Sequence, residues 1–190
     1  MRRRNLALAT LGVLLLILVA AVLIYIFGPQ RRQVQSASQA PIVGKAQIGQ
    51  PAPNFEVATT AGVFALDKTS KPVFLEVFAT WCPHCQREVK VVNRLYAKYR
   101  SAVDFVAVSG SDTAMDGTST SSELDVLDWQ RRFHVSYPVA YDPLLNVANL
   151  YLQGGFPTVA IIGRDKKVAY LNTGELSYDE LRGAIQKVLR

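Results

Sequence analysis

The only two cysteines in the 190-residue sequence, Cys82 and Cys85, are separated by just two residues. Before them lies "PVFLEVFA" (72–79), a nearly continuous apolar stretch of the kind that forms a strand buried on both faces. After Cys85, apolar side chains recur at helical spacing as far as Tyr99. The cysteine pair therefore stands where a central strand ends and a helix begins.

This position has chemical consequences for the two thiols. Pro83 suits the first turn of a helix, where its missing N–H costs nothing, so Cys82 is expected at the N-cap. Unpaired amides and the positive end of the helix dipole stabilise a thiolate there, which should lower the pKa of Cys82 from ~8.5 into the ~3.5–7.5 range. His84 adds a donor or a positive charge. Cys85, one turn further on, should face inward, so that Cys82 attacks and Cys85 resolves.

Other uses of the pair are open from the residues alone. A structural disulfide would close so small a loop that it removes only roughly 2 kcal/mol of chain entropy. A zinc site needs two further ligands, and the chain offers only His84 and His134. Covalent haem would require histidine where Gln86 stands. We expect no bound metal and no dissociable cofactor.

The N-terminal part of the chain predicts a membrane anchor. Residues 6–27 contain no charge over 22 positions, about the length that a ~30 Å hydrocarbon layer requires of a helix. A cleaved signal peptide is the alternative. Three arginines precede this segment and two follow it, so we expect a cytoplasmic tail at 1–5 and an extracytoplasmic domain. Residues 28–50 have the composition of a flexible tether, and 51–190 form the folded domain.

The net charge of +6 does not indicate a nucleic-acid partner. Six of the 21 basic residues precede residue 50 and no acidic residue does, so residues 50–190 carry 15 basic and 15 acidic side chains. A domain with equal numbers of basic and acidic side chains gives no indication of a basic face for a phosphate backbone.

Strands and helices alternate along the domain in the order β-β-β-α-β-α-α-β-β-α, which predicts an α/β fold with a mixed sheet and helices on both faces. The expected elements are a hairpin at 54–67 turning at Ala61-Gly62, strands at 72–79 and 102–110, and helices after Cys82, at 123–134, from Asp142-Pro143 to Tyr151 and after Ser177, with a second hairpin around 164–166. Residues 109–123 show no pattern and predict a mobile loop. The strand before it is expected to run parallel to the strand before Cys82, so this loop either overhangs the cysteines or is a surface insertion.

Two stretches resemble a known family. "FLEVFATWCPHCQREV" is similar to the active-site segment of the thioredoxin superfamily, and with "GGFPTVAIIGRDKKV" downstream the region 46–190 resembles the membrane-anchored TlpA/ResA/CcmG type. The resemblance implies a thioredoxin fold and dithiol–disulfide chemistry outside the cytoplasm. It also implies exported thiol or disulfide proteins as substrates and a redox partner in the membrane. We expect a monomer.

The family's functional residues map onto this sequence. Cys82 matches the attacking thiol, Cys85 the resolving thiol and Pro157 a cis-proline beside the disulfide. Glu76 matches a buried acid below the active site, which could relay the proton of Cys85 or could merely be tolerated beside a polar neighbour. Four further residues are expected to shape substrate binding: Trp81, Pro83, Phe156 and Thr158.

Glu88 matches an acid common in this family and is a second candidate proton relay, although a solvated surface glutamate is an equal alternative. Two departures from the family pattern stand out. Lys90 stands at a position where this family often has a proline that kinks the helix, so a straighter helix is predicted after the cysteines. Pro83-His84 is the dipeptide of the oxidising DsbA family in a scaffold better known for reductants, so the sequence leaves the direction of the reaction undecided.

We therefore predict a membrane-tethered oxidoreductase that exchanges disulfides with exported proteins, in cytochrome c maturation or in disulfide formation. A peroxiredoxin-like thiol peroxidase is one alternative, but it would need a proline and a threonine placed differently ahead of the cysteine. A non-catalytic copper or zinc carrier that uses both thiols and His84 is another alternative.

Overall fold

The computed structural model describes Leu18 and residues 44–190. The predicted tail, most of the predicted anchor at 6–27 and the tether as far as residue 43 lie outside the described residues. No helix in the described part of the chain is both long and apolar enough to cross a membrane.

One seven-stranded mixed sheet forms the centre of the domain, in the order β2-β1-β5-β4-β3-β6-β7. The strands are β1 (Glu56–Thr59), β2 (Gly62–Ala65), β3 (Val73–Phe78), β4 (Asp104–Ser109), β5 (Val139–Tyr141), β6 (Thr158–Ile162) and β7 (Val168–Thr173). The helices are α2 (Pro83–Tyr99), α3 (Glu123–Arg132), α4 (Asn146–Tyr151) and α5 (Tyr178–Leu189). β3, β4 and β5 run parallel to one another, and the other pairings are antiparallel.

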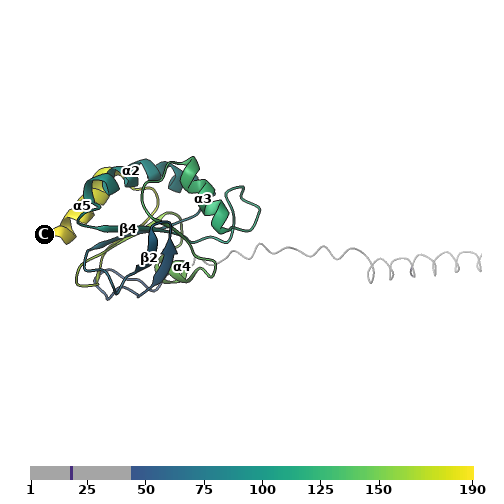
Figure 1. Ribbon diagram of the computed structural model, residues 1–190. Helices are drawn as coiled ribbons and strands as arrows, with labels where there is room; N and C mark the ends of the chain where they lie inside the picture. The colour runs from purple at the N-terminus through teal and green to yellow at the C-terminus, as the bar shows by residue number, and fades with distance from the viewer. Residues whose placement is uncertain (1–17, 19–43) are drawn as a thin grey trace, which may run out of the picture. The chain divides into compact units, whose positions relative to one another are not determined.

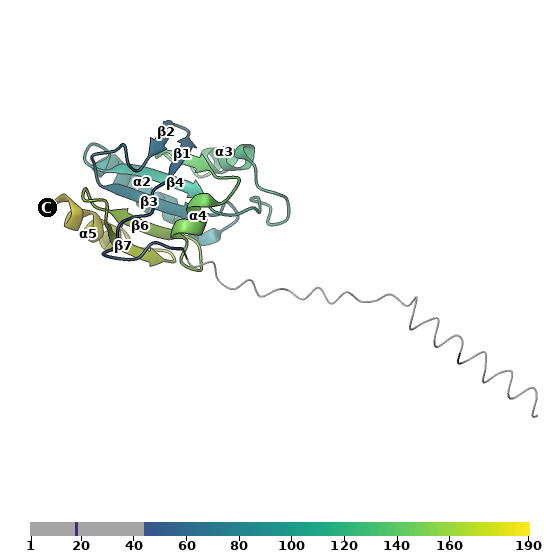
Figure 2. The same ribbon diagram turned by 90° about the horizontal axis from the view of Figure 1, so that it is seen from below.

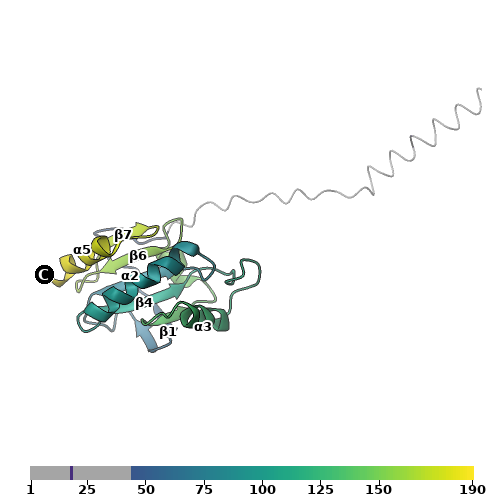
Figure 3. The same ribbon diagram turned by 90° about the horizontal axis from the view of Figure 1, so that it is seen from above.

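Helices cover both faces of this sheet. Helices α2, α3 and α5 lie on one face, as Figures 1 and 3 show, and α4 lies on the other, as Figure 2 shows. Every residue of β3 is buried, because its side chains alternate between the two layers of the core. Phe74 and Phe78 point to the α2 side, whereas Val73, Leu75 and Val77 point to the α4 side. The α/β mixed-sheet prediction is confirmed.

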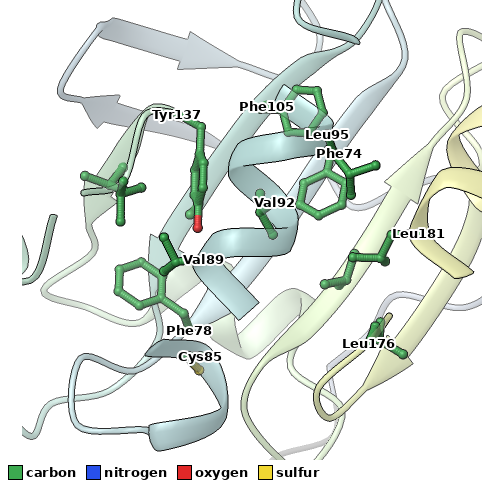
Figure 4. Close-up of a cluster of buried hydrophobic side chains, with 14 of the residues drawn as sticks. Phe74, Phe78, Cys85, Val89, Val92, Leu95, Phe105, Tyr137, Leu176 and Leu181 are labelled. Atoms are coloured by element: carbon green, nitrogen blue, oxygen red, sulfur yellow. The ribbon is translucent and has the colours of Figure 1, made fainter. Parts of the chain in front are cut away.

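The core on the α2 side lies directly beneath the cysteine pair. Figure 4 shows Cys85 at one end of a cluster in which α2 packs on β3, with Val89 and Val92 next along the helix and Phe78 at the end of β3. Each of these side chains is buried. Cys85 is therefore the end of an apolar layer and not part of an open surface, which places its thiol away from water.

The element order differs from the prediction at β5. This strand has three residues and pairs with β4 on one side and β1 on the other. So short a strand has no periodicity of its own and forms only because its neighbours supply the hydrogen bonds, so the sequence pattern gave no signal for it.

The predicted hairpin also turns one residue earlier than expected, since Gly62 already belongs to β2.

Two helix boundaries were predicted wrongly. Helix α4 begins at Asn146, three residues after Pro143, because the intervening residues form a turn with Leu145 in a left-handed conformation. Asp142 still accepts a hydrogen bond from the Val147 N–H at 2.7 Å, so it caps the helix from outside the first turn. Helix α3 ends at Arg132 and not at 134, because His134 has a positive φ of 54°.

The boundary between tether and domain also lies earlier than predicted. The backbone N–H of Ala46 donates to Leu150 at 2.9 Å, and that of Gly49 donates to Val168 at 2.8 Å. A Cβ on Gly44 would stand 2.5 Å from the Leu150 carbonyl oxygen, so only glycine permits this approach. Residues 44–50 thus belong to the folded domain.

The loop between β4 and α3 is more regular than its composition suggested. Thr113 and Thr120 form an isolated antiparallel bridge, and Asp116 accepts hydrogen bonds from the N–H groups of Thr118 and Ser119 at the turn. Asp125 at the start of α3 accepts a bond from the Met115 N–H at 2.9 Å. The expected patternless segment is thus a small hairpin-like loop.

Candidate active site

The sulfur of Cys82 lies where β3 passes into α2. Cys82 is the N-cap of the helix, with extended backbone angles (φ −75°, ψ 116°), and Pro83 occupies the first helical position. The Cys82 N–H donates to the Ala79 carbonyl at 3.1 Å, and its own carbonyl accepts the Gln86 N–H at 3.1 Å. The predicted N-cap position is confirmed.

Cys82 is the ionisable thiol of the pair. Its pKa is lowered to about 6, first by a hydrogen bond from the Cys85 thiol and then by the backbone N–H groups of Cys85 and His84, while burial opposes the shift. The direction is as predicted. The main cause differs from the predicted one, because the neighbouring thiol lowers the pKa of Cys82 more than the helix terminus on which the prediction relied.

Cys85 behaves in the opposite way. Burial raises its pKa far above the ordinary value, and the hydrogen bond that it gives to Cys82 raises it further. Both cysteines are free thiols in this structure, with Cys82 only 3 % exposed and Cys85 fully buried. The predicted asymmetry is thus present: one sulfur is a thiolate near neutral pH and the other holds its proton.

A cis peptide bond between Phe156 and Pro157 faces the sulfurs from the start of β6. The Phe156 carbonyl oxygen lies 3.6 Å from Cys82 Sγ. Only the protonated Cys82 thiol can donate to that oxygen, so this contact belongs to the un-ionised form of Cys82. The predicted cis geometry of Pro157 is confirmed.

Trp81 and Phe156 form the apolar border of the site. Their rings meet edge to face with centroids 5.9 Å apart, and Trp81 is 37 % exposed. The indole N–H of Trp81 donates to Ser111 Oγ at 2.9 Å, which brings the beginning of the β4–α3 loop beside the site. Pro83 is exposed next to Cys82.

Thr158 does not belong to this border. Its side chain is fully buried and its hydroxyl is paired with Thr173 Oγ1 at 2.5 Å and with the Gly155 carbonyl at 2.8 Å. The prediction that Thr158 contacts substrate is wrong for its side chain, because the alternation along β6 turns it inward.

Glu76 lies on β3 beneath the cysteines, on the face of the sheet that α2 covers. It is fully buried, and the Tyr137 hydroxyl donates to its Oε2 at 3.2 Å while Oε1 has no partner. Burial and the charge of Glu88 raise the pKa of Glu76 well above its usual value. The negative charge of Glu76 in turn raises the pKa of Cys85. Tyr137, the hydroxyl donor shown in Figure 4, was not predicted.

Glu88 is buried as well, so the alternative of a solvated surface glutamate is wrong. Its Oε1 accepts the Leu176 N–H at 2.7 Å, and its Oε2 has no partner. Burial raises its pKa to about 8, the Leu176 N–H opposes the shift, and the charge of Glu175 adds to it. Two buried carboxyl groups that bind protons readily thus interact electrostatically with Cys82.

His84 is an exposed residue on the rim of the site. Its Nδ1 lies near Arg87 and Glu175, neither of which the sequence analysis identified. Glu175 lies 91 positions from His84, and no pattern in the sequence connects them. Within residues 44–190, no group of three or more His, Cys, Asp and Glu side chains could hold a metal ion.

Comparison with known proteins agrees with this geometry. Residues 47–185 match the Redoxin family. The thiol-disulfide oxidoreductase ResA of Bacillus cereus is 33% identical over 147 residues, which cover 76% of this chain and 80% of that protein.

Solved structures agree as well. A Chlorobium tepidum protein described as a DsbE thiol:disulfide interchange protein superposes with a TM-score of 0.65 at 28% identity, covering 76% of this chain and 99% of its own. MTB dsbF superposes with a TM-score of 0.58 at 26% identity, covering 72% and 98%.

Proposed function

The chain belongs to the Redoxin family and is a thioredoxin-like thiol–disulfide oxidoreductase of the TlpA/ResA/CcmG type, and on this basis we propose that it exchanges disulfides with exported proteins from a membrane-tethered position. The observation that carries the proposal is the contrast between the two sulfurs. Cys82 has a pKa of about 6, whereas the pKa of Cys85 is strongly raised. That contrast is what thiol–disulfide exchange requires of an attacking and a resolving thiol.

The reaction proceeds in two exchanges. The Cys82 thiolate attacks one sulfur of a substrate disulfide, a mixed disulfide forms, and the other substrate sulfur leaves as a thiolate. Cys85 then loses its proton and attacks Cys82 Sγ, which releases the second substrate sulfur as a thiolate and leaves the Cys82–Cys85 disulfide. The same steps in reverse oxidise a substrate dithiol.

The buried carboxyl groups supply a route for the Cys85 proton. Glu76 and Glu88 both have raised pKa values because of burial, and each has one oxygen without a hydrogen-bond partner. Whichever of the two is ionised can take the proton as Cys85 becomes a nucleophile. Glu76 affects Cys85 directly through its charge, so we assign it the main role and Glu88 a supporting one.

Substrates approach over the apolar border that Trp81 and Phe156 form beside Cys82. Both residues lie next to the sulfur, and the half-exposed indole offers a flat apolar surface to an incoming chain. We assign substrate contact to Trp81, Pro83 and Phe156. The stabilised thiolate favours the dithiol form of the enzyme and so favours oxidation of substrates. The direction in a cell nevertheless depends on whether the redox partner oxidises or reduces the cysteine pair after each reaction.

The tethered location rests on the sequence. Residues 6–27 are long and apolar enough to span a membrane as a helix, and we propose that 1–5 lie in the cytoplasm while 28–43 link the anchor to the domain. A protease added to cells whose cell wall or outer membrane has been removed, but whose cell membrane is intact, should then degrade the domain. Digestion only after the membrane is lysed would place the domain in the cytoplasm and exclude this location.

The activity is tested by substituting each cysteine in turn. Cys82→Ser should abolish insulin reduction and the refolding of a reduced disulfide protein. Cys85→Ser should abolish turnover but trap a mixed disulfide between Cys82 and its substrate, visible as a reducible band on a gel. If Cys82→Ser leaves both activities unchanged, the proposed function is wrong.

A further inference from the structure

The hydroxyl of Thr158 is a buried polar group at the start of an apolar strand. Thr158 is fully buried, and the four residues that follow it in β6 are apolar and buried as well. A buried hydroxyl costs free energy unless it is hydrogen-bonded, and valine has nearly the same shape without that cost. The partners of the hydroxyl therefore indicate what this side chain does.

Every bonding position of the Thr158 hydroxyl is used. Its one proton goes to the Gly155 carbonyl at 2.8 Å, since a carbonyl can only accept. Its two lone pairs accept from the Gln153 N–H at 3.2 Å and from the Thr173 hydroxyl at 2.5 Å. The opposite arrangement, in which Thr173 donates to Gly155, would use a longer contact of 3.4 Å. Thr158 thus bonds both the loop that precedes its strand and the neighbouring strand β7.

The loop between α4 and β6 contains two residues that impose little conformation of their own. Gly154 and Gly155 are adjacent in it, and Gly154 adopts a φ of +83°. Glycine has the widest range of backbone angles, so bonds to other residues are needed to keep this segment in one shape. Thr158 provides two such bonds, one to Gln153 before the glycines and one to Gly155 itself.

The bond to Gly155 affects the active site through a single peptide unit. The Gly155 carbonyl lies in the same plane as the N and Cα atoms of Phe156, so the direction of this carbonyl determines where Phe156 begins. Phe156 in turn places its own carbonyl oxygen 3.6 Å from Cys82 Sγ and its ring edge to face with Trp81.

The surroundings of the Phe156 ring fit this one placement. A Cβ on Gly110 would stand 3.2 Å from Phe156 Cε1 and 2.5 Å from Val77 Cγ1, so the ring packs against a position where only glycine leaves room. The ring is therefore confined by Gly110 and Trp81, while its backbone is held from the side of Thr158.

We propose that Thr158 is a positioning residue for substrate binding, whose hydroxyl holds the Gly155–Phe156 peptide so that Phe156 meets the substrate beside Cys82. The Thr158 side chain itself does not touch the substrate. This inference deepens the proposed disulfide exchange and rests on it.

Loss of the hydroxyl should weaken substrate binding and leave the sulfur chemistry intact. The Cys82 thiolate is stabilised by the Cys85 thiol and by N–H groups at the start of α2, and the Phe156 carbonyl accepts only from the un-ionised sulfur. In the full chain, Thr158→Val should raise the KM for a synthetic peptide with one disulfide about tenfold, the equivalent of one lost hydrogen bond. The kcat should change by less than about twofold, because the lost contribution is to binding. Thr158→Ser keeps a hydroxyl and should restore the KM.

The two tryptophans give a spectroscopic signature of the same displacement. Trp81 contacts the Phe156 ring, whereas Trp129 stacks on Phe78 in the core. With isotope-labelled tryptophan, the indole N–H signal of Trp81 should move in Thr158→Val while that of Trp129 stays in place. If both signals move, the fold has changed, and Thr158→Ser is then compared with Thr158→Ala, which differs from it only in the hydroxyl. A KM about tenfold higher in the alanine variant supports the proposal, and equal KM values overturn it.

Thr59→Val is the matched control. Thr59 donates to the Gly62 carbonyl at 2.7 Å, again across three residues, but in the β1–β2 hairpin, which three strands separate from β6. Its loss should leave the KM unchanged. The proposal is overturned if Thr158→Val leaves the KM for the peptide unchanged, or if Thr59→Val raises it equally. Failure of the proposed function looks different, since the unsubstituted protein would then not turn over the peptide at all.

Discussion

At the scale of single residues, the reactivity of Cys82 depends more on one neighbour than on the helix that begins there. The hydrogen bond from the Cys85 thiol is the largest contribution that lowers its pKa, and the backbone N–H groups come after it. Burial acts against all of these. The resolving cysteine therefore has two roles, since it activates the first thiol before it attacks the mixed disulfide.

This dependence predicts the effect of Cys85→Ala. Removing the thiol donor should raise the pKa of Cys82 from about 6. A hydrogen bond to a charged group contributes roughly 1.5–3 kcal/mol, which corresponds to a rise of ~1–2 units. The ultraviolet absorbance of the thiolate, followed against pH, measures the shift.

Cys85→Ser is the matched control for that measurement. Its hydroxyl can still donate to the Cys82 sulfur, so the pKa of Cys82 should rise less than in the alanine variant. Equal pKa values in Cys85→Ala and the unsubstituted protein would mean that the helix terminus alone sustains the thiolate.

At the scale of elements, Asp125 joins three segments around the active site. Its Oδ2 accepts from the Thr80 hydroxyl at 2.7 Å, and its Oδ1 accepts from the Met115 N–H at 2.9 Å. Thr80 is fully buried and lies two residues before Cys82. One carboxylate on α3 therefore fastens both the β3–α2 junction and the loop that precedes α3.

Asp125→Ala should loosen this arrangement. The buried Thr80 hydroxyl and the Met115 N–H would lose their acceptor, which should lower the free energy of unfolding by roughly 2 kcal/mol. The loop at 110–121 should also be cleaved faster by proteases, because local opening becomes easier. Denaturant unfolding and limited proteolysis measure the two effects.

Asp128→Ala provides the comparison on the same helix. Asp128 is exposed and pairs only with Arg131 one turn away, so its loss should change stability by a few tenths of a kcal/mol. If Asp125→Ala and Asp128→Ala behave alike, the loop is not fastened through Asp125.

At the scale of the whole molecule, the sequence predicted what depends on local pattern. The burial of β3, the N-cap position of Cys82 and the start of α5 after Ser177 follow from residues close together in the chain. The expectations that failed depend on tertiary contacts instead. The packing of residues 44–50 and the three-residue strand β5 both require partners far away in sequence.

The same distinction applies to the candidate site. Glu76 and Glu88 were identified through the resemblance to the thioredoxin family, but the environment of Glu88 depends on Leu176, which the fold brings to α2. Tyr137, Asp125 and Glu175 gave no signal because each reaches the site from another element. Thr158 was predicted to shape substrate binding because its place beside Pro157 could not show which way its side chain points.

The whole fold should respond to pH differently in its two redox forms. In the dithiol form Cys82 has a pKa of about 6, against an ordinary ~8.5 in the unfolded chain. Between these values the unfolded state binds the proton and the folded state does not, so the stability of the dithiol form increases with pH. The disulfide form has no thiol and lacks this contribution, while Glu76 and Glu88 titrate in both forms.

Subtracting the free energy of unfolding of the disulfide form from that of the dithiol form therefore leaves the contribution of the thiols, together with the part of the Glu76 and Glu88 titration that depends on the charge of Cys82. The difference should rise by on the order of 2 kcal/mol from pH ~6 to ~8.5, where each pH unit contributes at most ~1.4 kcal/mol. Above ~8.5 it should fall again, since Cys85 ionises only in the unfolded chain. Denaturant titrations of both forms at several pH values measure it. A difference that is constant with pH would show that folding does not stabilise the Cys82 thiolate.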